Sequence, residues 1–261
     1  LRALFGTPAR SIHQGKAAMA GILACLWSRE GVTAGTDVVG ARHGLRVLSG
    51  KVDTDAILDG LGQHFLLAQT GYKRHAASGS LHAAIDAALA LRSDYRITPA
   101  DVVAVRIATH PLALDLAVPH ARPASAFSAK QSFHFSVAIA LQEGRCDLDL
   151  YADAMIADPE IRRLGACVQI EADTSMQYTE AMPAEVTITL RNGSCRKRRI
   201  DTPKGRPSNP MTSADLAAKF RQLAAGSLQP AHCEEVITNL ASADSFAIGA
   251  LMTKLAAARR S

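Results

Sequence analysis

The first strong pattern in the chain is a run of apolar residues at helical spacing near its start. Within residues 15–30, GKAAMAGILACLWSRE, apolar side chains recur every three or four positions from Ala18 to Trp27. This spacing is typical of an amphipathic helix. Gly31 follows directly, and glycine commonly ends a helix. The sequence therefore predicts a helix over 15–30, and weaker patterns predict one or two short helices over 53–68.

The same spacing predicts helices in the middle of the chain. Ser80 is a good N-cap for a helix over 81–92, whose apolar side chains form one stripe. A second helix is predicted over 130–143, and a short one over 159–164. Prolines break the pattern over 110–125, so we expect loop or short turns there.

Alternation of β-branched and other residues predicts strands between these helices. The segment DVVAVRIAT, residues 101–109, alternates in this way. Three further strands are predicted, over 166–172, 184–190 and 195–201. The last two flank Asn192 and Gly193, a dipeptide that is typical of a hairpin turn.

The pattern becomes helical again after Pro203. Thr212 or Ser213 precedes an apolar stripe, and further helices are predicted over 231–241 and 246–259. The order of helices, a mixed block and helices again is typical of an α+β unit inserted into a helical one. The predicted fold class is α+β and mostly helical, with a helical segment over 1–70, an inserted α+β domain over 71–203 and a returning helical segment over 204–261.

The composition is that of a globular protein with a mildly basic surface. Hydrophobic residues make up 48% of the chain, charged residues 20%, and the net charge is +5, which suits small acidic partners. The charges are spread and do not alternate with aromatics, which argues against nucleic acid as a partner. The basic run Arg196–Arg199 lies in a predicted strand. We expect these charges to keep an edge strand from pairing with strands of other molecules, rather than to bind nucleic acid or direct localisation.

Cysteine usage and hydropathy indicate a cytoplasmic protein. The five cysteines lie far apart and include no Cys-x-x-Cys pair, so we expect reduced thiols and no zinc site. No apolar run reaches the roughly 18 residues that a membrane span requires, and no signal peptide is visible. Motifs of nucleotide-binding loops and serine hydrolases are missing. Because the chain starts at Leu1 with a helix-like approach, we expect it to be the middle of a longer protein.

Basic side chains gather before the first predicted helix. His13 lies between Arg10 and Lys16, and a helix N-terminus favours anions. A polar cap without function is the simpler alternative. Lys204 and Arg206, in the proline-rich connector, either hold an anion or only keep the connector soluble.

A second cluster lies in GYKRHAASGSLHAAIDAAL, residues 71–89. Lys73 comes before the helix, His82 lies in its first turn, and Asp86 follows four residues later, so His82 and Asp86 can meet on one face. Such a pair can poise an imidazole for proton transfer; an ordinary surface pair is the alternative. We expect the neighbouring basic residues, Arg74 and His75, to lie at the surface.

Four segments, in order, resemble the MmgE/PrpD family. GTPARSIHQGKAAMAGILACLWSREGVTAG is similar to its Lys-x-x-His-x-Gly-x-Ala-Ala motif, and YKRHAASGSLHAAIDAALALR to its Lys-x-Tyr-Pro-x-Cys…His-x-x-Ile-Asp-Ala segment. SAKQSFHFSVAIALQEG resembles its Ser-x-x-Phe-Ser-x-x-Tyr helix, and PKGRPSNPMTSADLAAKFRQLA its Gly-x-Pro-x-Asn-Pro-Met-Thr…Lys-Phe segment. Together they cover Gly6 to about Ala225.

The resemblance implies an enzyme that acts on small di- or tricarboxylates. The family includes 2-methylcitrate dehydratase, cis-aconitate decarboxylase and iminodisuccinate epimerase, which share proton transfer next to a carboxylate without metal or cofactor. It implies a helical domain with an α+β lid, a site between the two, and a homodimer. We expect a lyase, with 2-methylcitrate dehydratase as the specific prediction. The alternative is an inactive fragment or a binding or assembly subunit, because the family's N-terminal helical portion is not in this chain.

The resemblance also assigns roles to single residues. His13 and His82 match histidines of the family, which implies catalytic roles, and Lys73 matches a carboxylate-binding lysine. Arg10 stands where a lysine is usual; it keeps the charge but cannot act as a base. Ser78 stands where Cys or His is usual, and Phe135 replaces a frequent Tyr. The predicted site residues are therefore His82 and His13 as catalytic, and Lys73, Arg10 and Ser78 as substrate-binding, with no metal ligands.

Overall fold

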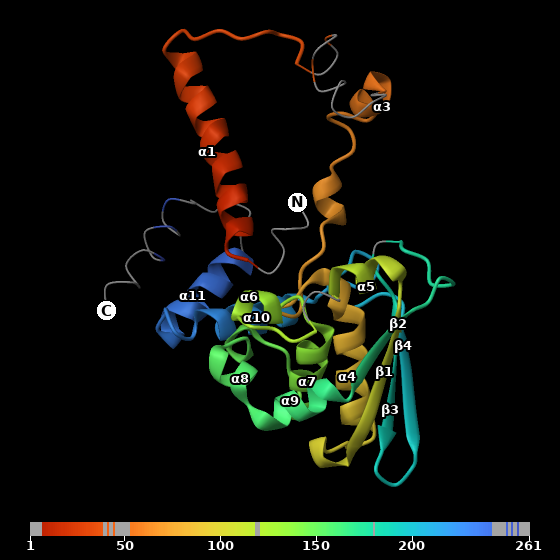
Figure 1. Cartoon of the computed structure of the whole chain (residues 1–261). Coiled ribbons are helices and arrows are strands. Elements are labelled where there is room, and N and C mark those ends of the chain that lie inside the picture. The colour runs from red at the N-terminus through yellow and green to blue at the C-terminus, as the bar shows by residue number, and fades with distance from the viewer. Residues whose placement is uncertain are drawn as a thin grey trace. The chain divides into compact units, whose positions relative to one another are not determined.

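The computed structural model describes residues 7–38, 41, 44, 53–117, 121–179, 181–241, 249, 252 and 255 (Figure 1). The chain divides into two compact units, Leu1–Thr70 and Gly71–Ser261. The helix predicted over 246–259 lies outside the described residues, apart from three isolated positions.

The first unit contains the predicted N-terminal helix, which is confirmed and begins earlier than expected. Helix α1 spans Ala9–Arg29. Gly31 follows with a positive φ of 87°, which agrees with the prediction that this glycine ends the helix. The two further short elements agree with the sequence pattern: α3, Thr54–Leu58, and the 3-10 turn η2, Leu66–Gln69. No described helix of the chain is long and apolar enough to cross a bilayer.

The second unit is built on a four-stranded mixed sheet with the order β2-β1-β3-β4. The strands are β1 (Val102–Thr109), β2 (Val168–Ala172), β3 (Ala184–Leu190) and β4 (Cys195–Ile200). Strand β1 pairs in parallel with β2 and antiparallel with β3, and a hairpin joins β3 to β4. All four predicted strands and the turn at Asn192 and Gly193 are thereby confirmed.

The basic run lies on an edge strand, as expected. In β4, Arg196 and Arg198 are opposite Ile188 and Val186 in the register, so they share the core face of the sheet. The Arg196 guanidinium lies 4.8 Å from the centre of the Tyr95 ring, and Arg198 pairs with Asp94. Charged residues that point inward on an edge strand hinder pairing with other chains.

Helices cover the sheet on the side seen to the left in Figure 1. Helix α4 (His82–Asp94) packs on β3, β4 and α7 (Phe133–Glu143), and α7 packs on α9 (Pro159–Ala166). Their shared core contains fully buried large side chains: Leu81, Ile85, Leu91, Ile107, Phe133, Ile139 and Ile188. Each such side chain contributes about 1.5–3 kcal/mol through burial, so this core fixes the position of α4. The described structure is α+β.

The remaining elements connect this core. They are the 3-10 turns η3 (Gly79–Leu81), η4 (Pro99–Asp101) and η6 (Leu148–Leu150) and the helices α5 (Pro111–Ala117), α6 (Ala126–Ala129), α8 (Asp153–Ala157), α10 (Ser213–Ala224) and α11 (Pro230–Ala241). The prediction of loop or short turns over 110–125 is wrong for α5. Pro111 is tolerated there because the first residue of a helix needs no backbone N–H partner.

Two helix caps were predicted, with opposite outcomes. Thr212 caps α10 in a capping box with Asp215, as expected. Ser80 does not cap α4: it lies inside η3, its hydroxyl donates to Ser78 Oγ at 3.1 Å, and the N-cap position is Leu81. The extra 3-10 turn moves the start of the helix past the serine.

Candidate functional site

Residues 71–79 form a loop whose backbone is tied to three distant segments of the second unit. Three amides donate to carbonyls far away in the sequence: Tyr72 to Gly205 at 2.7 Å, Ala76 to Cys146 at 3.3 Å, and Ser78 to Lys130 at 2.8 Å. These bonds hold the loop against the connector after β4, the end of α7 and the end of α6. The loop that carries Lys73 is therefore preorganised rather than free.

Two glycines permit the close crossing of this loop with the connector. Gly205 has φ +99°, and a Cβ built there would lie 2.1 Å from the Tyr72 carbonyl oxygen. A Cβ at Gly71 would lie 2.6 Å from the Gly205 carbonyl oxygen. Both positions therefore need a residue without a side chain.

Gly205→Ala should destabilise the second unit by about 2 kcal/mol or more, because an L-residue is strained at this φ and the Cβ meets backbone. Chemical denaturation monitored by circular dichroism measures this change. Gly226→Ala is the matched control, since a Cβ there meets nothing within 4 Å. Equal stabilities of the two variants would contradict the crossing as a structural requirement.

Below the loop lies a buried polar centre of two histidines and an aspartate. His75 and His82 are 3% and 2% exposed, and their rings meet edge to face with centroids 5.3 Å apart. Asp86 Oδ1 accepts from His75 Nε2 at 2.8 Å and from Arg74 at 3.1 Å, and Oδ2 accepts from the Lys204 amide at 3.0 Å. One carboxylate thus joins α4, the loop and the connector.

This geometry differs from the predicted His82–Asp86 pair. Asp86 bonds to His75, while His82 Nε2 lies 3.4 Å from the Ala77 carbonyl oxygen. The prediction that His75 is a surface residue is wrong. Arg74 keeps a partly exposed side chain. The sequence spacing allowed His82 to reach Asp86, but the loop folds back and offers His75 instead.

The surroundings of His82 and Asp86 lower the pKa values of both side chains. The pKa of His82 is lowered to about 3, mainly by burial and also by the neighbouring His75 and Lys73 charges, while the Ala77 carbonyl and Asp86 act in the opposite direction. Burial would raise the pKa of Asp86, but the hydrogen bond and charge of His75, the Lys204 amide and Arg74 lower it below its usual value. At neutral pH, His82 is therefore a neutral imidazole beside an ionised Asp86.

The side chains of Lys73 and His82 both approach the carbonyl oxygen of Ala77. Lys73 Nζ donates to the Ala77 carbonyl at 3.1 Å, the same oxygen that His82 Nε2 approaches. The proton on His82 must be on Nε2 for this contact to be a hydrogen bond. His82 then orients the carbonyl that holds the Lys73 ammonium, which is itself exposed to solvent.

Two further cations approach the loop. Lys219, from α10, donates to the Lys73 carbonyl, and burial lowers the pKa of its ammonium. Arg206 lies against the backbone of Gly79, where a built Cβ would be 3.0 Å from its Nη2. Lys204 instead pairs with Asp215 at 2.7 Å. Arg206 was among the cations expected from the sequence, whereas Lys219 was not. The signal for Lys219 was its place in the Lys-Phe segment that resembles the family.

The predicted site residues fall into two groups. Lys73, Ser78 and His82 lie together in the second unit, where Ser78 is half-buried at the start of η3. His13 is exposed on α1 of the first unit, and the side chain of Arg10 lies outside the described residues. The structure therefore brings three of the five predicted residues together.

Neither a metal centre nor a disulfide forms among the described residues. No group of three or more His, Cys, Asp or Glu side chains there could hold an ion, and all five cysteines are free. Cys146 is buried and its thiol lies 3.0 Å from the Tyr151 hydroxyl. Burial raises the pKa of this thiol to about 12, so it is unreactive.

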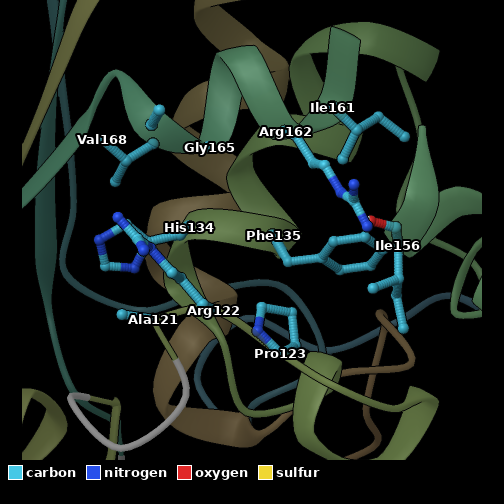
Figure 2. A pocket seen from close by; sticks show the side chains of 11 residues that line it. Ala121, Arg122, Pro123, His134, Phe135, Ile156, Ile161, Arg162, Gly165 and Val168 are labelled. Atoms are coloured by element: carbon cyan, nitrogen blue, oxygen red, sulfur yellow. The ribbon is translucent and has the colours of Figure 1, made fainter. Parts of the chain in front are cut away.

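A pocket of about 720 Å³ lies away from the Lys73 loop, against α7, α8 and α9 (Figure 2). Its lining includes Phe135 but none of the predicted catalytic or substrate-binding residues. Geometry and charge therefore favour the loop as the candidate site, while the pocket is a separate feature.

Comparison with known proteins gives a consistent assignment. Residues 75–242 match the MmgE/PrpD C-terminal domain. Cis-aconitate decarboxylase of Homo sapiens is 24% identical over 222 residues, which cover 82% of this chain and 46% of that protein. Cis-aconitate decarboxylase of Mus musculus is 25% identical over 260 residues, 95% of this chain and 52% of that protein. The chain thus spans about half the length of these relatives. The matched domain contains His75, His82, Asp86 and the connector, and the chain belongs to the MmgE/PrpD family.

Proposed function

We propose that this chain forms the carboxylate-binding part of a lyase that acts on a small tricarboxylate. The observation that carries the proposal is the approach of Lys73, Arg206 and Lys219 to one backbone-anchored loop. Cations on a fixed loop bind carboxylates with little loss of conformational entropy on binding. The relatives' name, cis-aconitate decarboxylase, makes cis-aconitate the first substrate to test; 2-methylcitrate dehydration is the second.

In this proposal Lys73 binds a substrate carboxylate, and Ser78 offers a hydroxyl beside it. His82 holds the Ala77 carbonyl and so positions Lys73. His82 and His13 remain the candidates for proton transfer. We also propose a cytoplasmic homodimer; sedimentation of the purified protein tests the dimer.

A carboxylate-binding subunit without turnover is the second candidate. The observation that favours it is the burial of His82, whose pKa of about 3 makes it a weak base. Thermal-shift titrations with cis-aconitate, 2-methylcitrate and citrate, read together with turnover assays, separate the candidates, because a bound ligand stabilises the native state. Binding with product formation supports the lyase, and binding without it supports the subunit. Absence of both contradicts the proposal.

Lys73→Ala should lower kcat/KM, or the affinity for the tricarboxylate, by about tenfold or more, which is about 1.4 kcal/mol. The reason is the loss of a positioned charge, and steady-state kinetics or calorimetry measures it. Lys197→Ala is the matched control, because Lys197 pairs with Glu185 on the edge of the sheet. An unchanged kcat/KM and affinity in Lys73→Ala would refute a carboxylate-binding role.

A further inference from the structure

The pocket against α7, α8 and α9 has apolar walls and a basic lining. Its apolar side includes Pro123, Phe135, Ile156, Ile161 and Val168. Its polar side is made by Arg122, His134 and Arg162, and none of its 11 described lining residues is acidic. A volume of about 720 Å³ lies within the range of pockets that hold small organic ligands.

A hydrogen bond fixes the orientation of the Arg162 side chain, but no carboxylate among the described residues pairs with it. Its Nε donates to the Ile156 carbonyl at 2.9 Å, and Figure 2 shows the side chain reaching toward Ile156. Among the residues that the structure describes, neither Arg162 nor Arg122 has a carboxylate partner. The next residue differs: Arg163 is paired with Glu160 and with two carbonyls. The pocket arginines therefore retain N–H donors for an anion.

His134 adds a buried polar atom without a partner. Its Nδ1 is buried and has no hydrogen-bond partner in the described part of the chain. Buried polar atoms are nearly always hydrogen-bonded, and an exception calls for a bound water, ion or ligand. Burial also lowers the pKa of His134, which favours a neutral ring that can donate or accept one bond.

We propose that this pocket binds an amphipathic organic anion, with its carboxylate or phosphate group held by Arg162 and its apolar part against Phe135, Ile156 and Ile161. Arg122 and His134, on the other side of the pocket in Figure 2, make the rest of the lining basic. Two guanidiniums favour the charge, since bidentate bonds from arginine match both carboxylate and phosphate. The apolar wall excludes water and favours a ligand with a hydrocarbon part over a fully polar tricarboxylate. This site does not depend on the proposed function of the Lys73 loop.

Calorimetric titration of the full 261-residue chain with hexanoate, hexyl phosphate and neutral hexanol tests the proposal. We expect hexanoate or hexyl phosphate to bind and hexanol to bind at least about tenfold more weakly. The stronger of the two anions identifies the head group. Arg162→Gln should weaken anion binding about tenfold, and Arg122→Gln should weaken it less. Arg106→Gln on β1, which removes an exposed pair with Glu171 on β2, should leave it unchanged.

A steric variant tests the location. A Cβ built at Gly165 meets only the His134 backbone and Cβ, at 3.6 Å or more, so Gly165→Ala should fold and retain binding. Gly165→Leu should extend into the pocket and abolish it. Tight binding that survives both arginine variants, equal affinity for hexanol, or no binding of either anion would overturn the proposal. The arginine variants decide the question even if Gly165→Leu fails to fold.

Discussion

Asp86→Ala is expected to lower the free energy of unfolding of the second unit by about 3 kcal/mol, because it removes one partner of a buried charged network. The side chains of Asp86 and His75 are 9% and 4% exposed. Without the carboxylate, His75 and the Lys204 amide lose their acceptor, and the link that Asp86 makes between the loop and the connector is lost. Denaturant titration measures the change, and loss of tricarboxylate binding should accompany it.

The matched control lies on the same helix. Asp94 pairs with Arg198, but both side chains are more than two-fifths exposed, so Asp94→Ala should cost less than about 1 kcal/mol. If the two aspartate variants were equally stable, the network around Asp86 would contribute nothing beyond a surface pair.

Acidification is expected to destabilise the protein through His82, before the carboxylates are protonated. The pKa of His82 is about 3 in the folded chain against 6.5 in the unfolded chain, so below pH 6.5 the unfolded state binds a proton that the folded state does not. The stability that the protein has while His82 is neutral in both states is fully present above pH 6.5 and is lost progressively as pH falls toward 3. The loss is about 1.4 kcal/mol per pH unit, or about 3 kcal/mol between pH 6.5 and pH 4. Asp86 adds to it only below about pH 4, since its pKa is also lowered.

Free energies of unfolding measured across this pH range test the assignment. His82→Gln keeps a donor for the Ala77 carbonyl but cannot titrate. The slope of its free energy of unfolding against pH should therefore be smaller, by the amount that corresponds to about one bound proton. His232→Gln, at an exposed histidine on α11, should keep the slope of the parent chain. A parent slope that persists in His82→Gln would assign the pH dependence to another group.

Local sequence patterns predicted most of the elements of the second unit. The hairpin at Asn192 and Gly193 and the Thr212 cap depend on residues next to each other, and both are confirmed. Ser80 failed as a cap because η3 displaced the start of α4. Helix α5 does not follow from the pattern of prolines as helix breakers, because Pro111 stands at its first position, where proline is tolerated.

The sequence named residues for the candidate site but did not predict its contacts. Resemblance to the family pointed to Lys73, Ser78 and His82, which lie together. It could not predict that Asp86 bonds to His75, or that Lys219 reaches the loop from 146 residues away. Those contacts depend on how the connector crosses the loop at Gly205, which no local pattern encodes.

Four segments of the sequence were enough to indicate the family. The α+β class and the order of strands and helices followed from side-chain periodicity and turn residues, which act over a few positions. Only the tertiary structure decided which histidine meets Asp86, which cations approach the loop, and where the basic pocket lies. These depend on long-range packing of α4 against the sheet and α7, where burial sets the protonation of His82 and the backbone crossing at Gly71 and Gly205 sets the position of Lys73.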